Sequence, residues 1–256
     1  MVELQIGVAK VPRHGMNESG DTLEMIERPG GGFSVVLVDG QGSGRGAKSL
    51  SNLIVTRAIA QLKDGARDGV VARGVHDYLY TYRMGQVAAT LNILSYDQHS
   101  GSILVSRNNP APFYVITPAG IHIHGEPADP IGLHPGTKPR ISEVAVQIPT
   151  YVIVFTDGLL KAGEAYGEDI ELVNFLSGWP SDTGTSAQQL ADALLARALE
   201  LDRNQPSDDM SVVVVAVLPG QNDQRIRRMT VQFPAKVLPP HQRSSNDDEP
   251  DAEDLG

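Results

Sequence analysis

Apolar residues alternate with polar ones, or form short unbroken runs, over much of this chain, and both patterns are typical of β-strands. Three such segments lie in the first forty residues, separated by polar or glycine-rich turns, which favours an antiparallel meander. The expected strands are 4–11, 21–28, 33–39, 89–97, 101–108, 112–120, 121–125, 140–149, 151–158 and 210–218, with 225–234 as a further edge strand. The segment 210–218 is apolar at almost every position, which predicts burial on both faces.

Helical periodicity replaces this alternation in two parts of the chain. Apolar residues spaced by three and four predict helices over 47–63 and 70–83, and helical signals return over 169–176 and 187–201. Ser186 and Gln189 form a capping-box pattern at the start of the last helix. Because helices and strands occur in separate blocks, the order predicts an α+β fold of packed sheets flanked by helices.

A glycine-rich stretch follows the third strand, with glycines at 40, 42, 44 and 46. A phosphate-binding P-loop and a dinucleotide-binding loop both need two glycines five residues apart, and even spacing cannot supply them. A hydrolase nucleophile elbow around Ser43 would need glycines at positions that hold Gln41 and Arg45. The stretch therefore matches none of these three loops.

Aspartates stand at the ends of several predicted strands. Asp39 and Asp157 each follow an apolar strand and precede a glycine, Asp208 and Asp209 precede the last strand, and Asp21 opens the second. Taken alone, Asp39 fits equally well a carboxylate that caps the following helix. Together, and in a chain without cysteine, these acids predict a site for a hard cation such as Mg²⁺ or Mn²⁺.

The charge of the chain narrows the choice of partner. The formal net charge is -10, and residues 241–256 carry six acids and one arginine. The remainder is also acidic, which argues against nucleic acid because phosphate contacts need a basic face. No apolar run approaches the roughly 18 residues of a membrane span, and the start lacks a signal-peptide pattern. We expect a cytoplasmic protein with no membrane partner.

Four motifs, in order, resemble those of the metal-dependent PPM (PP2C-type) serine/threonine phosphatases. They are GD at 20–21, DGQGSG at 39–44, TDGL at 156–159 and DDMS at 208–211. Within that family the chain is most similar to the bacterial sporulation stage II E-type (SpoIIE-like) branch, and there to the compact phosphatases of the stressosome. The resemblance implies a PP2C-like four-layer αββα sandwich, in which two mainly antiparallel sheets are flanked by helices. We expect a phosphatase domain over 1–238 and a disordered acidic tail over 239–256.

The resemblance also implies a role for each motif position. It implies two Mn²⁺ or Mg²⁺ ions, with Asp39 bridging them. Gly40 would bind one ion through its carbonyl group, and Asp21 would serve the same ion. Asp157 and Asp208 are implied as ligands of the other ion, so Asp39, Asp157 and Asp208 are the expected catalytic residues.

Some positions depart from the family or stay open. Asp209 stands where the family often has asparagine, and we expect it only to support the ligands from outside. Gln41 replaces the histidine that protonates the leaving oxygen in eukaryotic members, which leaves the proton donor unassigned. Arg13 is either a surface arginine, the simpler interpretation, or a group that binds the substrate phosphate. His122 and His124 share one strand face, and exposed edge-strand residues are a simpler interpretation than a metal pair.

Two functions from different classes follow from these observations. The first is a metal-dependent phosphatase that hydrolyses phosphoserine or phosphothreonine through a water activated by two ions. Its implied substrate is a phosphorylated partner-switching protein in sigma-factor control, a STAS-domain antagonist or a stressosome component. The alternative is a degenerate PPM fold that binds a partner without catalysis. The four aspartate positions favour the enzyme, because a scaffold has no need to gather carboxylates.

Overall fold

The computed structural model describes residues 2–179, 185–220 and 227–234. The chain divides into two units, residues 1–221 and residues 222–256. All the described helices and strands belong to the first unit. In the second unit, residues 227–234 are exposed and have no regular secondary structure. The predicted acidic tail, 239–256, lies outside the described residues.

The edge strand expected over 225–234 is wrong for the described residues of that segment. Met229, Val231 and Phe233 do alternate with polar residues, but all three are exposed. A period-two pattern supplies only the side chains of a strand; it does not supply the neighbouring strand that β pairing needs.

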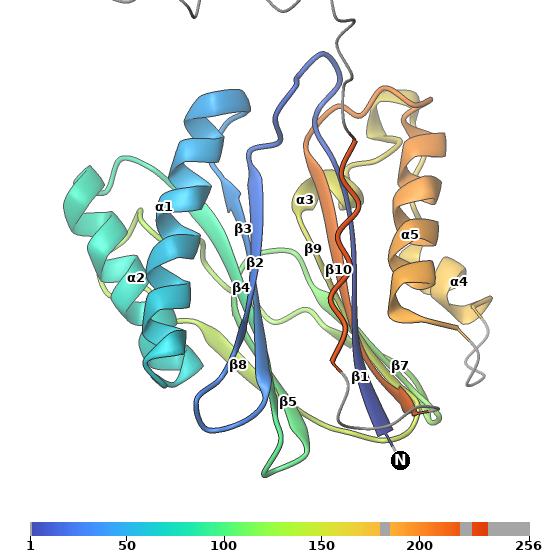
Figure 1. Ribbon diagram of the computed structural model, residues 1–256. Helices are drawn as coiled ribbons and strands as arrows, with labels where there is room; N and C mark the ends of the chain where they lie inside the picture. Colours follow the sequence, from blue (N-terminus) through green and yellow to red (C-terminus); the bar gives the residue numbers. More distant parts are fainter. Residues whose placement is uncertain (1, 180–184, 221–226, 235–256) are drawn as a thin grey trace, which may run out of the picture. The chain divides into compact units, whose positions relative to one another are not determined.

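The first unit is built on two five-stranded antiparallel sheets (Figure 1). The strand order of the first sheet is β1 (Val2–Val11), β10 (Met210–Pro219), β9 (Thr150–Phe155), β6 (Phe113–Thr117) and β7 (Gly120–His124). The order of the second sheet is β2 (Asp21–Glu27), β3 (Phe33–Gly40), β4 (Ala89–Asp97), β5 (Ser102–Asn108) and β8 (Arg140–Ala145).

The expected meander of the first three strands is wrong for β1. β2 and β3 do pair with each other, but β1 pairs with β10 along its whole length, from Val2 opposite Pro219 to Val11 opposite Met210. The ten-residue β10 matches the ten residues of β1, whereas β2 has seven. A partner from the other end of the described unit therefore outcompetes the adjacent strand.

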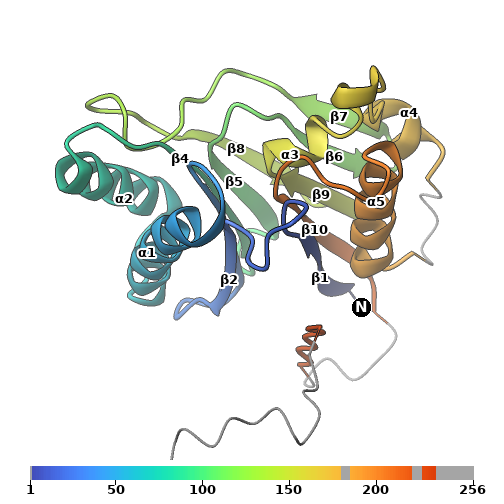
Figure 2. The same cartoon turned by 90° about the horizontal axis from the view of Figure 1, so that it is seen from above.

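Helices cover the outer face of each sheet and complete the four-layer αββα arrangement (Figures 1 and 2). Two long helices, α1 (Gly44–Lys63) and α2 (Asp68–Arg83), pack on the second sheet. The first sheet carries α3 (Asp157–Leu160), the short 3₁₀ helix 164–166, α4 (Leu172–Ser177) and α5 (Ala187–Leu201). Each predicted helix is found, although α1 begins three residues earlier than expected, and Ser186 and Gln189 form the predicted capping box.

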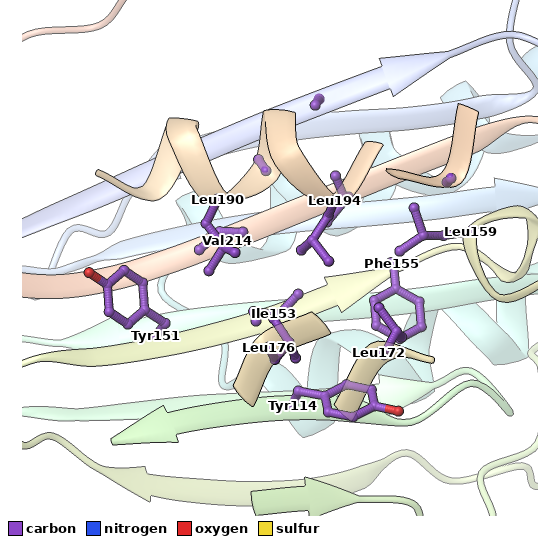
Figure 3. Close-up of a cluster of buried hydrophobic side chains, with 14 of the residues drawn as sticks. Tyr114, Tyr151, Ile153, Phe155, Leu159, Leu172, Leu176, Leu190, Leu194 and Val214 are labelled. Carbon is purple, nitrogen blue, oxygen red and sulfur yellow. The ribbon is translucent and has the colours of Figure 1, made fainter. Parts of the chain in front are cut away.

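Alternation along the central strands divides the core into layers. In β10, Val212 and Val214 face α5, whereas Val213 and Val215 face the opposite sheet. Figure 3 shows the cluster between the first sheet and its helices, where Val214 and Ile153 meet Leu190 and Leu194 of α5. Burial of β10 on both faces is confirmed, and it fixes the position of the polar residues at its start.

Candidate functional site

A cavity of about 360 Å³ opens where strands from both sheets end. Its wall includes the carboxylates of Asp39, at the end of β3, Asp157, just after β9, and Asp208, just before β10. Other wall residues are Arg13, Gln41, Gly42, Ser43, Ala88, Ala89, Thr90, Pro130 and Lys161. Three acids that the sequence places far apart therefore share one cavity.

The antiparallel pairing of β9 and β10 brings two of these acids together. Phe155 pairs with Val212, so the end of β9 and the start of β10 lie at the same edge of the sheet. Gly158 allows the close approach beyond the paired residues, because a Cβ there would lie 2.1 Å from the carbonyl oxygen of Asp209. The glycine of the TDG motif is thus required by packing.

Asp39 faces a second carboxylate across the β2–β3 ladder. Asp21 is its direct partner in the antiparallel register, which places both side chains on the same face of the sheet. Burial, together with the charges of Asp21, Asp157 and Asp208, raises the pKa of Asp39 to about 8. Opposed carboxylates of this kind are unfavourable unless a proton or a cation neutralises them.

Asp21 is not part of the cavity wall and is 1% exposed. Its Oδ2 accepts hydrogen bonds from Ser211 Oγ at 2.6 Å and Thr156 Oγ1 at 3.0 Å. Its buried Oδ1 has no hydrogen-bond partner among the described residues. Burial raises the pKa of Asp21 to about 6, although the hydrogen bonds from Ser211 and Thr156 oppose the shift.

Asp209 supports the site through the backbone. Its Oδ1 accepts a hydrogen bond from Arg13 N at 2.8 Å, and its Oδ2 accepts one from Gly20 N at 2.7 Å. These bonds hold the connection between β1 and β2 against the start of β10. Asp209 is 5% exposed and is not part of the cavity wall.

Contacts with neighbouring segments explain the first two residues of the glycine-rich stretch, Gly40 and Gln41. A Cβ on Gly40 would lie 2.4 Å from the carbonyl oxygen of Ala47, so glycine lets the start of α1 approach the end of β3. Gln41 donates its backbone N–H to the carbonyl oxygen of Ala88 at 3.2 Å, and its Oε1 accepts from Ala88 N at 2.7 Å. The glutamine thus holds the cavity wall to the start of β4.

Two cationic side chains reach the same cavity. Arg13 is exposed on the wall of the cavity. This position fits both interpretations drawn from the sequence, a surface arginine and a group that binds the substrate phosphate. Lys161 Nζ lies 2.5 Å from Asp157 Oδ2 and 3.5 Å from Asp208 Oδ2. The hydrogen bond with Asp157 raises the pKa of Lys161.

Sequence reasoning missed three residues of this site: Thr156, Ser211 and Lys161. The two hydroxyl residues lie inside the TDGL and DDMS motifs, and a buried acid's need for hydrogen-bond donors is the signal that could have found them. Lys161 follows Asp157 by four residues, which is the spacing of a helical ion pair. His122, by contrast, is exposed on the edge strand β7, and the ring of His124 stacks on Phe113 at 4.3 Å.

The acids of the site offer the oxygen ligands that a divalent metal ion needs, but they are not yet arranged around one point. Within the described ranges, no three acidic or histidine side chains already surround one point as metal ligands would. Even so, Oδ1 of buried Asp21 has no hydrogen-bond partner in the described part of the chain, and this atom and the raised pKa of Asp39 both indicate a need for positive charge. Hard carboxylate oxygens are the ligands that Mg²⁺ and Mn²⁺ prefer. The residues present therefore fit such an ion.

Comparison with known proteins supports the fold and gives the family. The family model of Stage II sporulation protein E (SpoIIE) matches residues 29–218. The Bacillus subtilis (strain 168) protein of that name is 21% identical over 214 residues, which are 82% of this chain and 25% of that protein. The chain thus spans about a quarter of the length of this relative.

Solved structures share the architecture at low sequence identity. The PP2C phosphatase domain of SpoIIE from Bacillus subtilis, with a fragment of its regulatory domain, has a TM-score of 0.76 at 20% identity, covering 86% of this chain and 65% of that one. RsbX in complex with magnesium has a TM-score of 0.65 at 16% identity, covering 85% and 98%. The catalytic domain of the phosphatase PstP with two manganese ions has a TM-score of 0.63 at 14% identity, covering 86% and 100%.

These likenesses agree with the two helix-covered antiparallel sheets described above. The family model covers well over half of the chain, including three of the four motifs that first indicated the resemblance. In the described part, no helix is both long and apolar enough to cross a membrane. The chain belongs to the Stage II sporulation protein E family and has the PP2C fold.

Proposed function

We propose that this chain is a protein phosphatase that hydrolyses phosphoserine or phosphothreonine on a signalling protein and depends on divalent metal ions. The observation that carries the proposal is the convergence of Asp39, Asp157 and Asp208, from three separate strand ends, on one cavity. Clustered carboxylates raise one another's pKa and cost stability. A binding scaffold gains nothing from such a cluster, whereas a metal-dependent hydrolase requires it.

The proposed metal ligands are acids of the cavity wall together with the buried acid Asp21. Asp39, Asp157 and Asp208 would hold Mn²⁺ or Mg²⁺, two ions per site, with Asp21 and the carbonyl group of Gly40 on the Asp39 side. Bound divalent ions would lower the pKa of a water nucleophile and offset the charge of the phosphoryl oxygens. The metals named with RsbX and PstP support this choice of ions.

The remaining residues position the substrate and the ligands. Arg13 is held by its backbone bond to Asp209, and its side chain on the wall would bind two phosphoryl oxygens. Thr156 and Ser211 hold one oxygen of Asp21 and leave the other without a partner within the described structure. Gln41 has no acidic proton to give, and it shapes the wall through Ala88. The serine or threonine oxygen that leaves phosphorus would therefore take its proton from water.

The substrate class is part of the proposal. The resemblance of the sequence motifs to those of stressosome phosphatases, together with the fold shared with RsbX, supports a phosphorylated partner-switching protein, a STAS-domain antagonist or a stressosome component, in stress or sigma-factor signalling. The acidic net charge favours a protein substrate over nucleic acid. A cytoplasmic location belongs to the same proposal, because that is where such signalling proteins act. The phosphatase domain is proposed to span 1–238, with an acidic tail over 239–256.

The test is phosphate release from a phosphoserine peptide and from p-nitrophenyl phosphate. We expect activity with Mn²⁺, its loss with excess EDTA, and a fall of at least about a hundredfold in Asp39→Asn. Asp77→Asn is the matched control, because Asp77 is a carboxylate 73% exposed on α2 that is not part of the cavity wall. Equal, near-zero rates under all conditions would instead identify a degenerate PPM fold that binds without catalysis.

A further inference from the structure

Lys161 holds the two acids that are proposed to bind one of the metal ions. It directly follows the single turn of α3, and its Nζ lies 2.5 Å from Asp157 Oδ2 and 3.5 Å from Asp208 Oδ2. Asp208 Oδ1 is also engaged, since it accepts a hydrogen bond from Asp209 N at 2.9 Å. The ammonium group therefore links the end of β9 to the start of β10 at the wall of the cavity.

This contact contributes little to the stability of the fold. The side chains of Lys161, Asp157 and Asp208 are 44%, 43% and 35% exposed. Ion pairs that face water to this extent add little net free energy of folding, because solvent screens them and ordering a long lysine side chain costs entropy. The ammonium group matters more for the binding of other cations, because it contacts one carboxylate oxygen of each acid.

The other half of the site is formed by Asp39 and Asp21 and is called the Asp39 half below. Asp39 and Asp21 face each other across the ladder, and Asp21 Oδ1 has no hydrogen-bond partner within the described structure. Two lysines beside Asp21, Lys10 and Lys48, donate to its backbone carbonyl oxygen at 2.9 Å each, not to its carboxylate. The Asp157–Asp208 half thus already holds a cation of the chain, whereas the Asp39 half does not among the described contacts.

We propose that Lys161 is a tethered cation that competes with a divalent ion for Asp157 and Asp208, so that the two halves of the site load unequally. The inference rests on the proposed function. A divalent ion bound by Asp157 and Asp208 would lie close to the ammonium group, which contacts Oδ2 of both acids, and the two positive charges would repel each other. Displacing Lys161 from these oxygens costs free energy, which weakens binding there and leaves the Asp39 half to fill first.

Counting bound Mn²⁺ tests this inference directly. Free Mn²⁺ is measured by electron paramagnetic resonance during titration of the full chain, and isothermal titration calorimetry gives the affinities. We expect two classes of site in the wild type. Lys161→Gln should tighten the weaker class on the order of tenfold, because the competing charge is gone, and should change the stronger class less than about threefold.

Two further variants separate competition from other effects of the substitution. Lys161→Arg keeps the positive charge and should leave the second class weak. Lys63→Gln removes the same charge from an exposed position at the far end of α1 and should leave both affinities unchanged. Circular dichroism and thermal unfolding check that each variant is folded. We expect this result because Lys161 is half-exposed.

The outcomes distinguish failure of this inference from failure of the proposed function. If both sites of the wild type bind Mn²⁺ with equal affinity, or if Lys161→Gln changes neither affinity, the competition is overturned. The proposed phosphatase function is unaffected by either result. Tightening in Lys161→Arg equal to that in Lys161→Gln would overturn it as well. Absence of Mn²⁺ binding from every variant would overturn the metal-dependent function and this inference together.

Discussion

Single residues in this site are held by hydrogen bonds whose removal has a predictable cost. Ser211 is 1% exposed and donates at 2.6 Å to the carboxylate of Asp21. We expect Ser211→Ala to lower the free energy of unfolding by about 1.5–3 kcal/mol at pH 8, because it removes a hydrogen bond to a buried charged group. Urea denaturation of the metal-free protein measures the change.

A matched serine provides the control for that substitution. Ser106 is fully buried, and its hydroxyl has no hydrogen-bond partner among the described residues. Ser106→Ala should therefore be neutral or slightly stabilising. Equal losses in both variants would mean that Ser211 contributes only packing and that Asp21 does not depend on it.

The protonation of Asp39 predicts a pH dependence of stability. Its pKa is about 8 in the folded protein, against an ordinary value of 3.8. The folded state therefore binds this proton more tightly than the unfolded state does, and the associated stability is lost as the pH rises from about 4 to about 8. The amide that replaces this carboxyl group in Asp39→Asn carries no charge at any of these pH values.

Accordingly, metal-free Asp39→Asn should be more stable than the wild type by about 1–3 kcal/mol at pH 8.5, and the difference should shrink toward pH 5. The same substitution should abolish phosphatase activity, so stability and function would change in opposite directions. Urea denaturation in EDTA at several pH values is the measurement. A variant less stable than the wild type at pH 8.5 would show that the charge on Asp39 is already compensated in the metal-free protein.

The acids of the site could be predicted from the sequence because each stands at the end of an apolar strand. What the sequence does not contain is the direction in which a flexible side chain turns. Lys161 lies in no recognised motif, and its contact with Asp208 joins residues 47 positions apart. The buried pairing of Thr156 and Ser211 with Asp21 likewise depends on how the two sheets face each other.

At the scale of elements, the packing of β3 against α1 makes opposite predictions for two glycines of one stretch. A Cβ on Gly40 would lie 2.4 Å from the carbonyl oxygen of Ala47, whereas one on Gly46 would have nothing within 4 Å. We expect Gly40→Ala to destabilise the protein by about 2 kcal/mol or more and to reduce activity by displacing the start of α1 from the end of β3. Thermal unfolding and the peptide assay report both effects.

Gly46→Ala is the control within the same stretch. Gly46 lies in the first turn of α1, and alanine favours helix by roughly 0.5–1 kcal/mol over glycine. This variant should be as stable as the wild type or more stable, with unchanged activity. Similar losses in the two variants would contradict the account of why glycine is needed at position 40.

The elements themselves could be predicted closely from periodicity, whereas their neighbours could not. The apolar run of β10 indicated its own burial, and the capping box marked the start of α5. The sheet to which β1 belongs depends on a partner near the other end of the described chain, and alternation carries no information about such distant pairing. Residues 227–234 illustrate the opposite case, a strand pattern without a strand.

At the scale of the whole molecule, a metal ion that binds only the folded chain must stabilise it. At a free concentration near a hundred times its dissociation constant, a single ion adds about 2.7 kcal/mol. For a domain of this size we expect Mn²⁺ to raise Tm by about 5–10 °C. The increase should be absent from Asp39→Asn and from wild type given NaCl at the same ionic strength. A similar increase with NaCl would indicate general screening of the acidic chain in place of a specific site.

The most direct test of the central claim is the anomalous scattering of Mn²⁺ in crystals of this protein. We expect a strong peak in the cavity at the end of β3, within about 2.1 Å of a carboxylate oxygen of Asp39. A second and weaker peak beside Asp157 and Asp208 should gain occupancy in Lys161→Gln. Crystals that bind Mn²⁺ only elsewhere, with Asp39 free of metal at saturating concentration, would contradict the claim that these strand ends form a metal-dependent catalytic centre.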